Sequence, residues 1–283
     1  MLARTRAKGL SVVSSTAPNG RVRSDGDVGP QLAQSVERAL TILESFSSRR
    51  PELGVQELAR ALDTSPSTVS RLLAALENRG YVAQDDATGR FRLGSRALEL
   101  GYRFADTDGL MIHAAPHVDA LARQLKLTTE LYVLDGNQMI RYMTAHSPPG
   151  QGMLGGSRFY PYRSAAGKIL LAHLSTDVLA TLISGDQSGA QPTLDELKRS
   201  LASARQGGYA SDDEHAGIGK RSLAVPVRDA SSEVVAALSV SGPVSRLSDR
   251  DMPSILEVVF DRAYEFSKSL GFRPHQALCD PAP

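Results

Sequence analysis

The stretch SPSTVSRLLAALENRG, residues 65–80, carries the signals of one well-bounded helix. Ser65 is a typical N-cap residue, Pro66 suits the first helical position, and Gly80 can adopt the left-handed conformation in which many helices end. Apolar residues recur within the stretch at spacings of three and four, so they share one face of the predicted helix. That face consists of Val69, Leu72, Leu73 and Leu76.

The polar face of this helix has the composition of a surface that reads DNA. Small side chains allow a helix to approach the major groove closely, hydroxyls can donate to phosphates or bases, and an arginine can form two hydrogen bonds with a guanine. Any amphipathic helix exposes polar residues, so the face alone leaves an ordinary solvated surface open as well. The candidate DNA-contacting residues of this stretch are Ser65, Ser67, Thr68, Ser70 and Arg71.

Two further helical patterns precede this helix, one beginning near Gln31 and the other at Val55. Three short helices in this order are typical of a helix-turn-helix domain. In the first of them, the residues expected to face the core are Val36, Ala39, Leu40, Leu43 and Phe46.

A basic hairpin follows the third helix. Its sequence alternates like two short strands around a Thr-Gly turn, with Phe91 and Leu93 expected on the buried face. The other face carries Arg90 and Arg92, which would meet the DNA backbone or the minor groove. Helices followed by a basic hairpin predict a winged helix-turn-helix domain over residues 31–94, and both arginines join the DNA-contacting candidates.

The charge balance qualifies this prediction. The chain has 32 basic and 31 acidic side chains, a net charge of +1, whereas DNA-binding domains usually carry a basic excess. Residues 31–100, which contain the predicted DNA-binding domain and are called the reading domain below, hold nine arginines and nine acids. The reading domain is therefore neutral. A neutral module binds DNA tightly only when several copies act together. We therefore expect a homodimer or a dimer of dimers on double-stranded operator DNA with repeated half-sites.

Composition places the chain among globular proteins. The 283-residue length suits two domains, and 41% of the residues are hydrophobic and 22% charged. No apolar run approaches the ~18 residues of a membrane helix, and Cys279 is the sole cysteine, so we expect a cytoplasmic protein without disulfides. Residues 1–30 lack any sustained period and are expected to form a disordered basic tail, and residues 274–283 a flexible one.

The remainder of the chain predicts a linker helix and a mixed α+β domain. Residues 95–109 form the linker helix, in which Ala97, Gly101 and Ala105 make a stripe of small residues suited to close packing. Helical and strand patterns then alternate over residues 110–273. They comprise a helix opening at Pro116, a hairpin over 129–144, helices over 164–174 and 194–208, two strands within 222–242 and a helix over 253–271.

The residues give little support to catalysis. Gly167 and Lys168 resemble the end of a P-loop, but Tyr162 stands where that motif needs a glycine. His113 and His117 have the spacing of metal ligands on a helix, yet we expect Pro116 to interrupt that helix between them. We therefore predict no catalytic residue, no metal and no cofactor. An enzyme, or a small-molecule-sensing module whose helical domain makes protein contacts, remains the alternative.

Several segments resemble one known family. SVERALTILESF (35–46), VQELARALDTSPSTVSRLLAALENRGYV (55–82) and GRFRLGSRALELG (89–101) are very similar to the reader domain of the IclR (isocitrate lyase regulator) family of transcription factors. RSAAGKILLAHL, GGYASDDEHAGIGKRSLAVPVRD and AALSVSGPVSRLS agree independently in the second domain. The resemblance covers about residues 31–272. It implies a winged helix, a linker helix that dimerises, and a C-terminal GAF-like effector-binding domain.

The resemblance also implies a function and a second set of site residues. The expected function is ligand-responsive regulation, by repression, of a catabolic or metabolic operon, with a small carboxylate as effector. Ser222 stands where relatives often carry cysteine, and Lys220 where they often carry an apolar residue; Lys220 would favour an anionic effector if it faces the pocket rather than solvent. The implied pocket residues are Ala165, Ala166, Asp212, Ser222, Ser239 and Ser241, with Met143 and Leu154 as an apolar wall.

Overall fold

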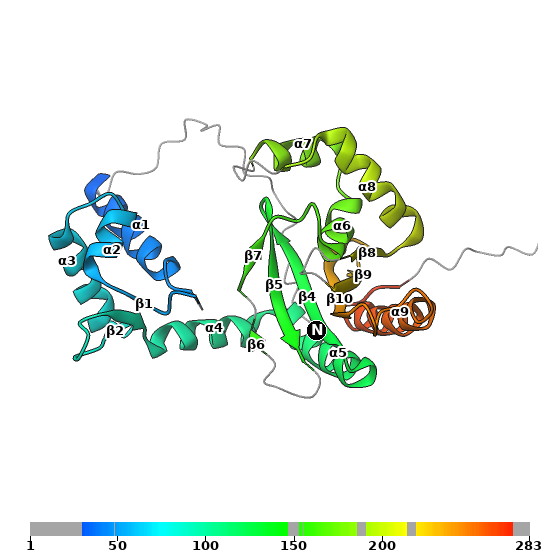
Figure 1. The fold of residues 1–283 in the computed structure, drawn as a ribbon, viewed down its shortest axis with the longest axis horizontal. Coiled ribbons are helices and arrows are strands. Elements are labelled where there is room, and N and C mark those ends of the chain that lie inside the picture. Colours follow the sequence, from blue (N-terminus) through cyan, green and yellow to red (C-terminus); the bar gives the residue numbers. More distant parts are fainter. Residues whose placement is uncertain are drawn as a thin grey trace, which may run out of the picture. The chain divides into compact units, whose positions relative to one another are not determined.

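The computed structural model describes residues 30–47, 49–146, 153–154, 156–185, 191–213 and 219–273. Within this part, the chain divides into two compact units between Asp108 and Gly109. The predicted tails fall outside it, apart from Pro30, which begins the first helix. Each unit is described here by itself (Figure 1).

The first unit is a winged helix-turn-helix, as the sequence predicts. Its three strands form an antiparallel sheet in the order β1-β3-β2. The predictions missed β1, because a strand of two residues leaves no periodic pattern. The elements are α1 (Pro30–Glu44), β1 (Glu52–Leu53), α2 (Val55–Ala61), α3 (Pro66–Asn78), β2 (Val82–Gln84), β3 (Phe91–Leu93) and α4 (Ser95–Thr107).

The core of this unit contacts only part of the apolar stripe predicted for the first helix: Leu43 and Phe46 join the core as predicted, and Ile42 joins it as well. Ile42 and Phe46 are buried, whereas Val36 and Leu40 are each 54% exposed. The apolar stripe of α1 is wider than the core contact, so only the edge that carries Ile42 packs inward. In β3, Leu93 is 42% exposed and only Phe91 is buried. The remaining buried side chains are Leu53, Leu58, Ala59, Val69, Leu73 and Val82.

Helix α4 has no buried residue within its unit. It ends at Thr107, Asp108 is extended, and α5 begins at Gly109, so the predicted linker segment contains a break between two helices. The predicted small residues of α4 are only half-buried, and large apolar side chains beside them are about half exposed: Leu98, Leu100, Tyr102 and Phe104. In the described part of this unit, the helix therefore presents an apolar face whose large side chains are about half exposed.

The second unit is built on one antiparallel sheet in the order β6-β5-β4-β10-β9-β8, with β7 also pairing with β5. The predicted hairpins and helices are present, and the sequence reading missed β6, β7, β8 and α7. The elements are α5 (Gly109–Leu125), β4 (Thr128–Asp135), β5 (Gln138–Ala145), β6 (Met153–Leu154), β7 (Arg158–Phe159), α6 (Ala165–Ala172), α7 (Thr176–Ser184), α8 (Leu194–Gly207), β8 (Ala210–Asp213), β9 (Lys220–Arg228), β10 (Val234–Pro243) and α9 (Met252–Ser269).

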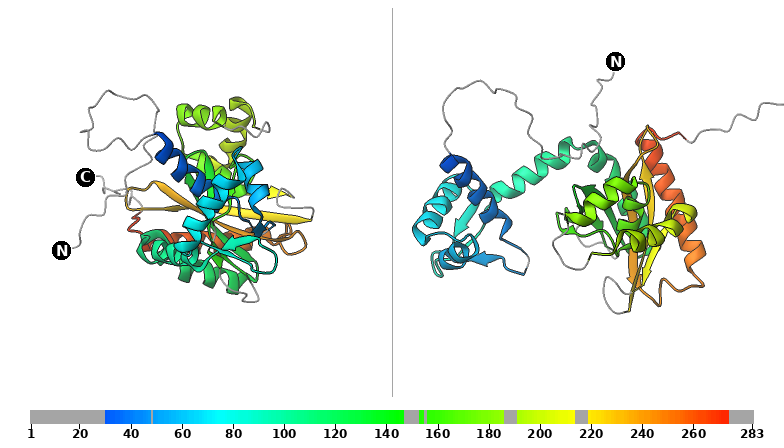
Figure 2. Two further views of the ribbon diagram at one scale, coloured as in Figure 1. Left: turned by 90° about the vertical axis from the view of Figure 1, so that its left-hand side faces the viewer. Right: turned by 90° about the horizontal axis from the view of Figure 1, so that it is seen from above.

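Helices cover this sheet on both faces. Helices α5 and α9 pack on one face around Leu121, Leu238 and Phe266, and α6 packs on the other around Ile169 and Ala237. Figure 2 shows α9 and α6 on opposite sides of strands β9 and β10. Helix α8 packs outside α6, and α7 contacts α8. Alternation along each strand therefore decides which residues join the α5–α9 core and which face the side of α6.

Pro116 lies inside α5 and does not open a helix. The prediction of a break before His117 is therefore wrong. Proline removes one backbone hydrogen bond from a helix interior, but α5 buries Met111 and Ala114 before Pro116 and Val118 after it. This packing holds both halves of the helix on the sheet.

We expect His117 to make the stability of this unit depend on pH. Its ring stacks on Phe266 with the ring centroids 5.0 Å apart. Burial is the main cause that lowers the pKa of His117; Arg262 and His113 add to the effect and Glu265 opposes it. The folded chain thus prefers the neutral ring, whereas the unfolded chain takes up a proton near the ordinary pKa of about 6.5. Well above about pH 6.5, His117 is neutral in both states and the stability does not depend on its protonation. As the pH decreases from about 6.5 towards the lowered pKa of the folded chain, the free energy of unfolding falls.

We expect His117→Phe to remove part of this loss of stability at low pH, because phenylalanine keeps the stacking and cannot take up a proton. The measurement is the free energy of unfolding in urea at about pH 7.5 and about pH 5.5. Ile112→Phe adds a phenylalanine at a 55% exposed position of the same helix without changing any charge, so it is the matched control and should retain the wild-type difference. An unchanged difference in His117→Phe would contradict the prediction.

Candidate functional site

Helix α3 exposes the polar face that the sequence predicts. The Ser65 hydroxyl caps the helix by accepting from the Thr68 amide at 3.2 Å, and it lies 3.0 Å from the Ser67 hydroxyl and 2.9 Å from that of Thr68. Ser67, Ser70 and Arg71 are exposed, whereas Val69 and Leu73 on the opposite face are buried. The start of α3 therefore presents hydroxyls and a guanidinium together on one accessible surface.

The two arginines of the wing are placed differently. Arg90 donates to the Glu57 carboxylate at 2.7 Å and to the Glu52 carbonyl at 3.0 Å, which ties the wing to the start of α2. The Gly54 amide also donates to Glu57, and this bond, with Arg90, lowers the pKa of Glu57. Arg90 thus pairs with an acid 33 residues away while its side chain is 39% exposed, so its contact with DNA stays a prediction. Arg92 is exposed.

The second unit contains a cavity of about 700 Å³ between the sheet and the segment that leads into α6. Five of the implied pocket residues line it: Ala166, Asp212, Ser222, Ser239 and Ser241. Strands β4 and β5 supply Thr128, Glu130, Tyr132, Met139 and Arg141, and the other lining residues are His146, Phe159, Tyr160, Arg163, Ser164 and Lys220. The residues of β4 and β5 were not predicted to line the pocket, although the spacing of Thr128 and Glu130, two apart on a strand, places both on one face.

Strand register explains why polar residues gather here. Asp212 on β8 pairs with Ser222 on β9, Ser222 with Ser241 on β10, and Ser241 with Thr128 on β4. Ser239, two residues from Ser241, pairs with Glu130. Directly paired residues share a face of the sheet. The neighbouring Leu131, Leu223 and Val240 on the same strands point the other way, into the α5–α9 core, so the polar row faces the cavity.

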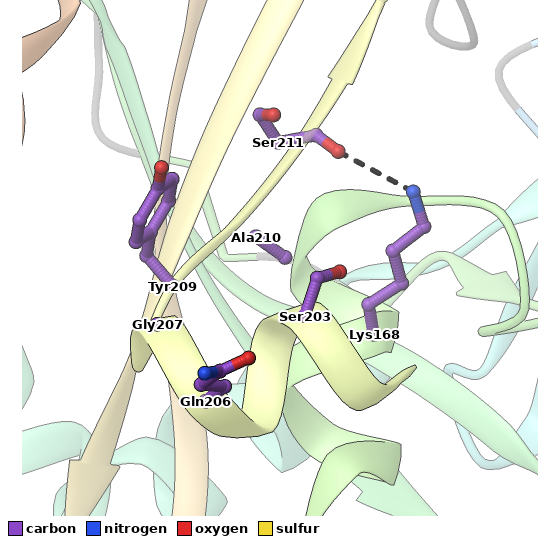
Figure 3. A pocket seen from close by; sticks show the side chains of 7 residues that line it. All are labelled: Lys168, Ser203, Gln206, Gly207, Tyr209, Ala210 and Ser211. Carbon is purple, nitrogen blue, oxygen red and sulfur yellow. Dashed lines mark hydrogen bonds between the residues drawn. The ribbon is translucent and has the colours of Figure 1, made fainter. Parts of the chain in front are cut away.

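Asp212 links the sheet to the start of α6. It is 5% exposed, and its Oδ2 accepts from the Ala165 amide at 2.6 Å. Further along α6, Lys168 donates to the Ser211 carbonyl at 3.3 Å beside a smaller hollow of about 340 Å³ (Figure 3). Two hydrogen bonds thus fasten α6 to an edge strand. The Oδ1 of Asp212 is buried and has no hydrogen-bond partner among the residues that the structure describes.

Two of the backbone amides at the start of α6 already donate hydrogen bonds within the chain. Ser164 caps the helix and accepts from the Gly167 amide at 3.0 Å. The Ala165 amide, expected to meet a ligand carboxylate, donates to Asp212. Ala166 lines the cavity. The hydrogen bond that the Ala165 amide was expected to give to a ligand carboxylate is therefore given to Asp212 instead.

Met143 does not line the cavity, and this expectation is corrected. A β-bulge between Leu131 and Tyr132 pairs Met143 with Leu131 but Arg141 with Tyr132. The bulge reverses the alternation along β5, so Met143 packs against the α5–α9 core with Leu131. Met139 takes its place as an apolar lining residue. Leu154 pairs with Met143 through β6, and its side chain lies outside the described residues.

Charged groups of both signs line the cavity. Arg141 and Glu130 form an ion pair at 3.3 Å, with their side chains 32% and 13% exposed. Arg141 also donates to the Ser157 hydroxyl and lies over the Phe159 ring. Burial raises the pKa of Tyr132 well above its usual range. The lining cations are Arg141, Arg163 and Lys220, against the two carboxylates of Glu130 and Asp212.

This balance gives the cavity a net charge of +1, leaving His146 aside. The sequence left open whether Lys220 faces the pocket or solvent. In the structure it is exposed and also lines the cavity.

In the described ranges, no group of three or more His, Cys, Asp or Glu side chains could hold a metal ion. No helix in those ranges is long and apolar enough to cross a membrane.

Two family models match the chain. One, described as the IclR helix-turn-helix domain, matches residues 35–86. The other, described as the C-terminal domain of the bacterial transcriptional regulator IclR, matches residues 103–268.

Individual relatives agree with these matches. The chain is 31% identical to the HTH-type transcriptional regulator XynR of Escherichia coli K12, over 85% of this chain and 98% of that protein. It is 30% identical to the HTH-type transcriptional repressor AllR of the same organism, over 90% and 97% of the two chains. A solved structure from Rhodococcus sp. RHA1, described as a transcriptional regulator, is 30% identical with a TM-score of 0.70 and covers 84% of this chain and 98% of its own.

Proposed function

Because the chain belongs to the IclR family of bacterial transcriptional regulators, we propose that α3 enters the major groove of an operator and that a small acid in the cavity controls this binding. The observation that carries the DNA-binding mode is the exposed set of hydroxyls and Arg71 at the start of α3. A helix start also offers free amides and a positive dipole end to a phosphate. Arg92, which is exposed on the wing, would contact the neighbouring backbone.

We propose that the protein acts as a homodimer or a dimer of dimers through α4. The reading domain is electrically neutral, so one copy gains little from phosphate attraction. The exposed apolar residues of α4 supply a surface on which two copies can pair, and Leu100 and Phe104 are part of it. The description of AllR as a repressor supports repression as the mode of control.

We propose that the effector is a small carboxylate and that the second unit is regulatory rather than catalytic. The excess of cations along the cavity favours an anion. The relatives are named as regulators, which supports a role without catalysis. The protein would act in the cytoplasm on a catabolic or metabolic operon.

Arg71→Ala tests the placement of α3. We expect it to weaken specific DNA binding by about 1–3 kcal/mol, since an arginine that contacts a base edge contributes about this much. The DNA is a duplex that the wild-type protein selects from a random-sequence library, and fluorescence anisotropy at fixed salt gives the affinity. Arg123→Ala removes the same charge from an exposed position on α5 and should change little. Equal losses in the two variants would indicate general electrostatic attraction and would contradict the proposed contact.

A further inference from the structure

The Oδ1 atom of Asp212 is buried and accepts no hydrogen bond from the described residues of the chain. Its partner oxygen, Oδ2, is satisfied by the Ala165 amide at 2.6 Å. The carboxylate is 5% exposed and lines the cavity. Buried carboxylate oxygens are normally hydrogen-bonded, because leaving one without a partner is unfavourable. A bound molecule is therefore expected to bring a donor to this point.

The surroundings of Asp212 indicate which donor is suitable. A ligand carboxylate cannot donate and would be repelled by Asp212, so the anionic part of an effector is directed elsewhere in the cavity. An ammonium group could donate, but three cations line the same space: Arg141, Arg163 and Lys220. A neutral hydroxyl donates to Asp212 without meeting either repulsion.

The rest of the lining favours more than one hydroxyl. Ser222, Ser241 and Thr128 continue the polar row from Asp212 across three more strands, and Ser239 pairs with Glu130 beside it. Among the described lining residues, wholly apolar surface comes from Met139, Phe159 and Ala166, apart from the rings of two tyrosines. Such a lining can exchange hydrogen bonds with a polyhydroxylated chain, and it offers little to a bare hydrocarbon.

We infer that the effector is a hydroxylated carboxylic acid, with a hydroxyl that donates to Asp212 Oδ1 and a carboxylate that the lining cations hold. This inference rests on the proposed function and narrows it from small acids in general to hydroxy acids. A site built to bond a hydroxyl discriminates strongly against the analogue that lacks it, because its own polar group is then left buried and unpaired.

The first test needs no variant. Isothermal titration of the full-length wild-type protein compares gluconate with hexanoate, and lactate with propionate and alanine. We expect the hydroxylated acid of each set to bind roughly tenfold or more tightly than its unsubstituted partner. Alanine carries an ammonium group in place of the lactate hydroxyl. Tighter binding of alanine than of lactate would overturn the assignment to a hydroxyl.

Asp212→Asn tests whether Asp212 is the residue that causes the preference for hydroxylated acids. The asparagine can still accept from the Ala165 amide through its oxygen, which turns its NH₂ group towards the ligand. We expect the preference for the hydroxylated acid to shrink strongly, while the thermal unfolding temperature shows that the variant remains folded. Asp261→Asn removes the same charge from an exposed position on α9 and should retain the wild-type preference.

The outcomes separate this inference from the proposed function. If acids bind and alter DNA affinity without any preference for hydroxyls, or with a preference that Asp212→Asn does not change, the inference is wrong and acid control stands. If no acid of the panel binds a protein that still binds its selected duplex, control by small acids is wrong as well.

Discussion

Gly167→Ala is expected to destabilise the second unit by about 1–3 kcal/mol, the usual cost of forcing extra volume into a packed site. Gly167 lies in the first turn of α6 and is buried. A Cβ atom at this position would overlap the backbone carbonyl of Pro161. Neither backbone can move without displacing the start of α6, which Asp212 and Ser164 hold by hydrogen bonds.

A destabilising effect of Gly167→Ala would be informative, because it is opposite in sign to the usual effect of this exchange in a helix. Alanine is a better helix former than glycine by up to about 1 kcal/mol, so the same exchange at an open helical position is neutral or stabilising. Gly109→Ala at the start of α5 is the control, since nothing lies within 4 Å of an added Cβ there. Urea unfolding followed by circular dichroism gives both values. A stabilised Gly167→Ala would show that the approach of Pro161 to α6 is not as close as described.

The sequence predicts best where the deciding signals are local. The cap, the initial proline and the apolar face of α3 all lie within fourteen residues, and the structure reproduces them. The hairpin of β4 and β5 follows from its Asp-Gly turn in the same way. Local signals fail where packing decides between two acceptable faces, as in α1, where Ile42 is buried and Leu40 is exposed.

The site could be predicted only in part, for physical reasons that differ between residues. Ser239 and Ser241 share a face because they are two apart on one strand, which sequence alone can state. Met143 has the same spacing from Arg141, but the β-bulge between them reverses its direction, and a bulge leaves no sequence pattern here. Arg90 is held by Glu57 through a contact between distant segments. Such contacts depend on tertiary structure, which periodicity does not encode.

Leu100→Lys is expected to lower the affinity for a selected operator duplex by roughly 100- to 10,000-fold, the range by which linked binding events exceed single ones. Leu100 is 56% exposed on α4, so the folded chain loses no core contact when it is replaced. If two copies pair through this face, a lysine buried there in each copy would leave unpaired charges in an apolar interface. Half-sites would then be bound one at a time by a neutral reading domain.

Asp106→Lys is the matched control, because it places the same side chain on α4 at an exposed position on the opposite, charged side of the helix, near Glu99 and Arg103. Sedimentation velocity should show monomers for Leu100→Lys and the wild-type assembly for Asp106→Lys, with operator affinity following the assembly. A Leu100→Lys protein that remains dimeric and binds normally would show that another surface joins the copies. A monomer that binds as tightly as the wild type would contradict the argument from charge, because a neutral reading domain would then suffice alone.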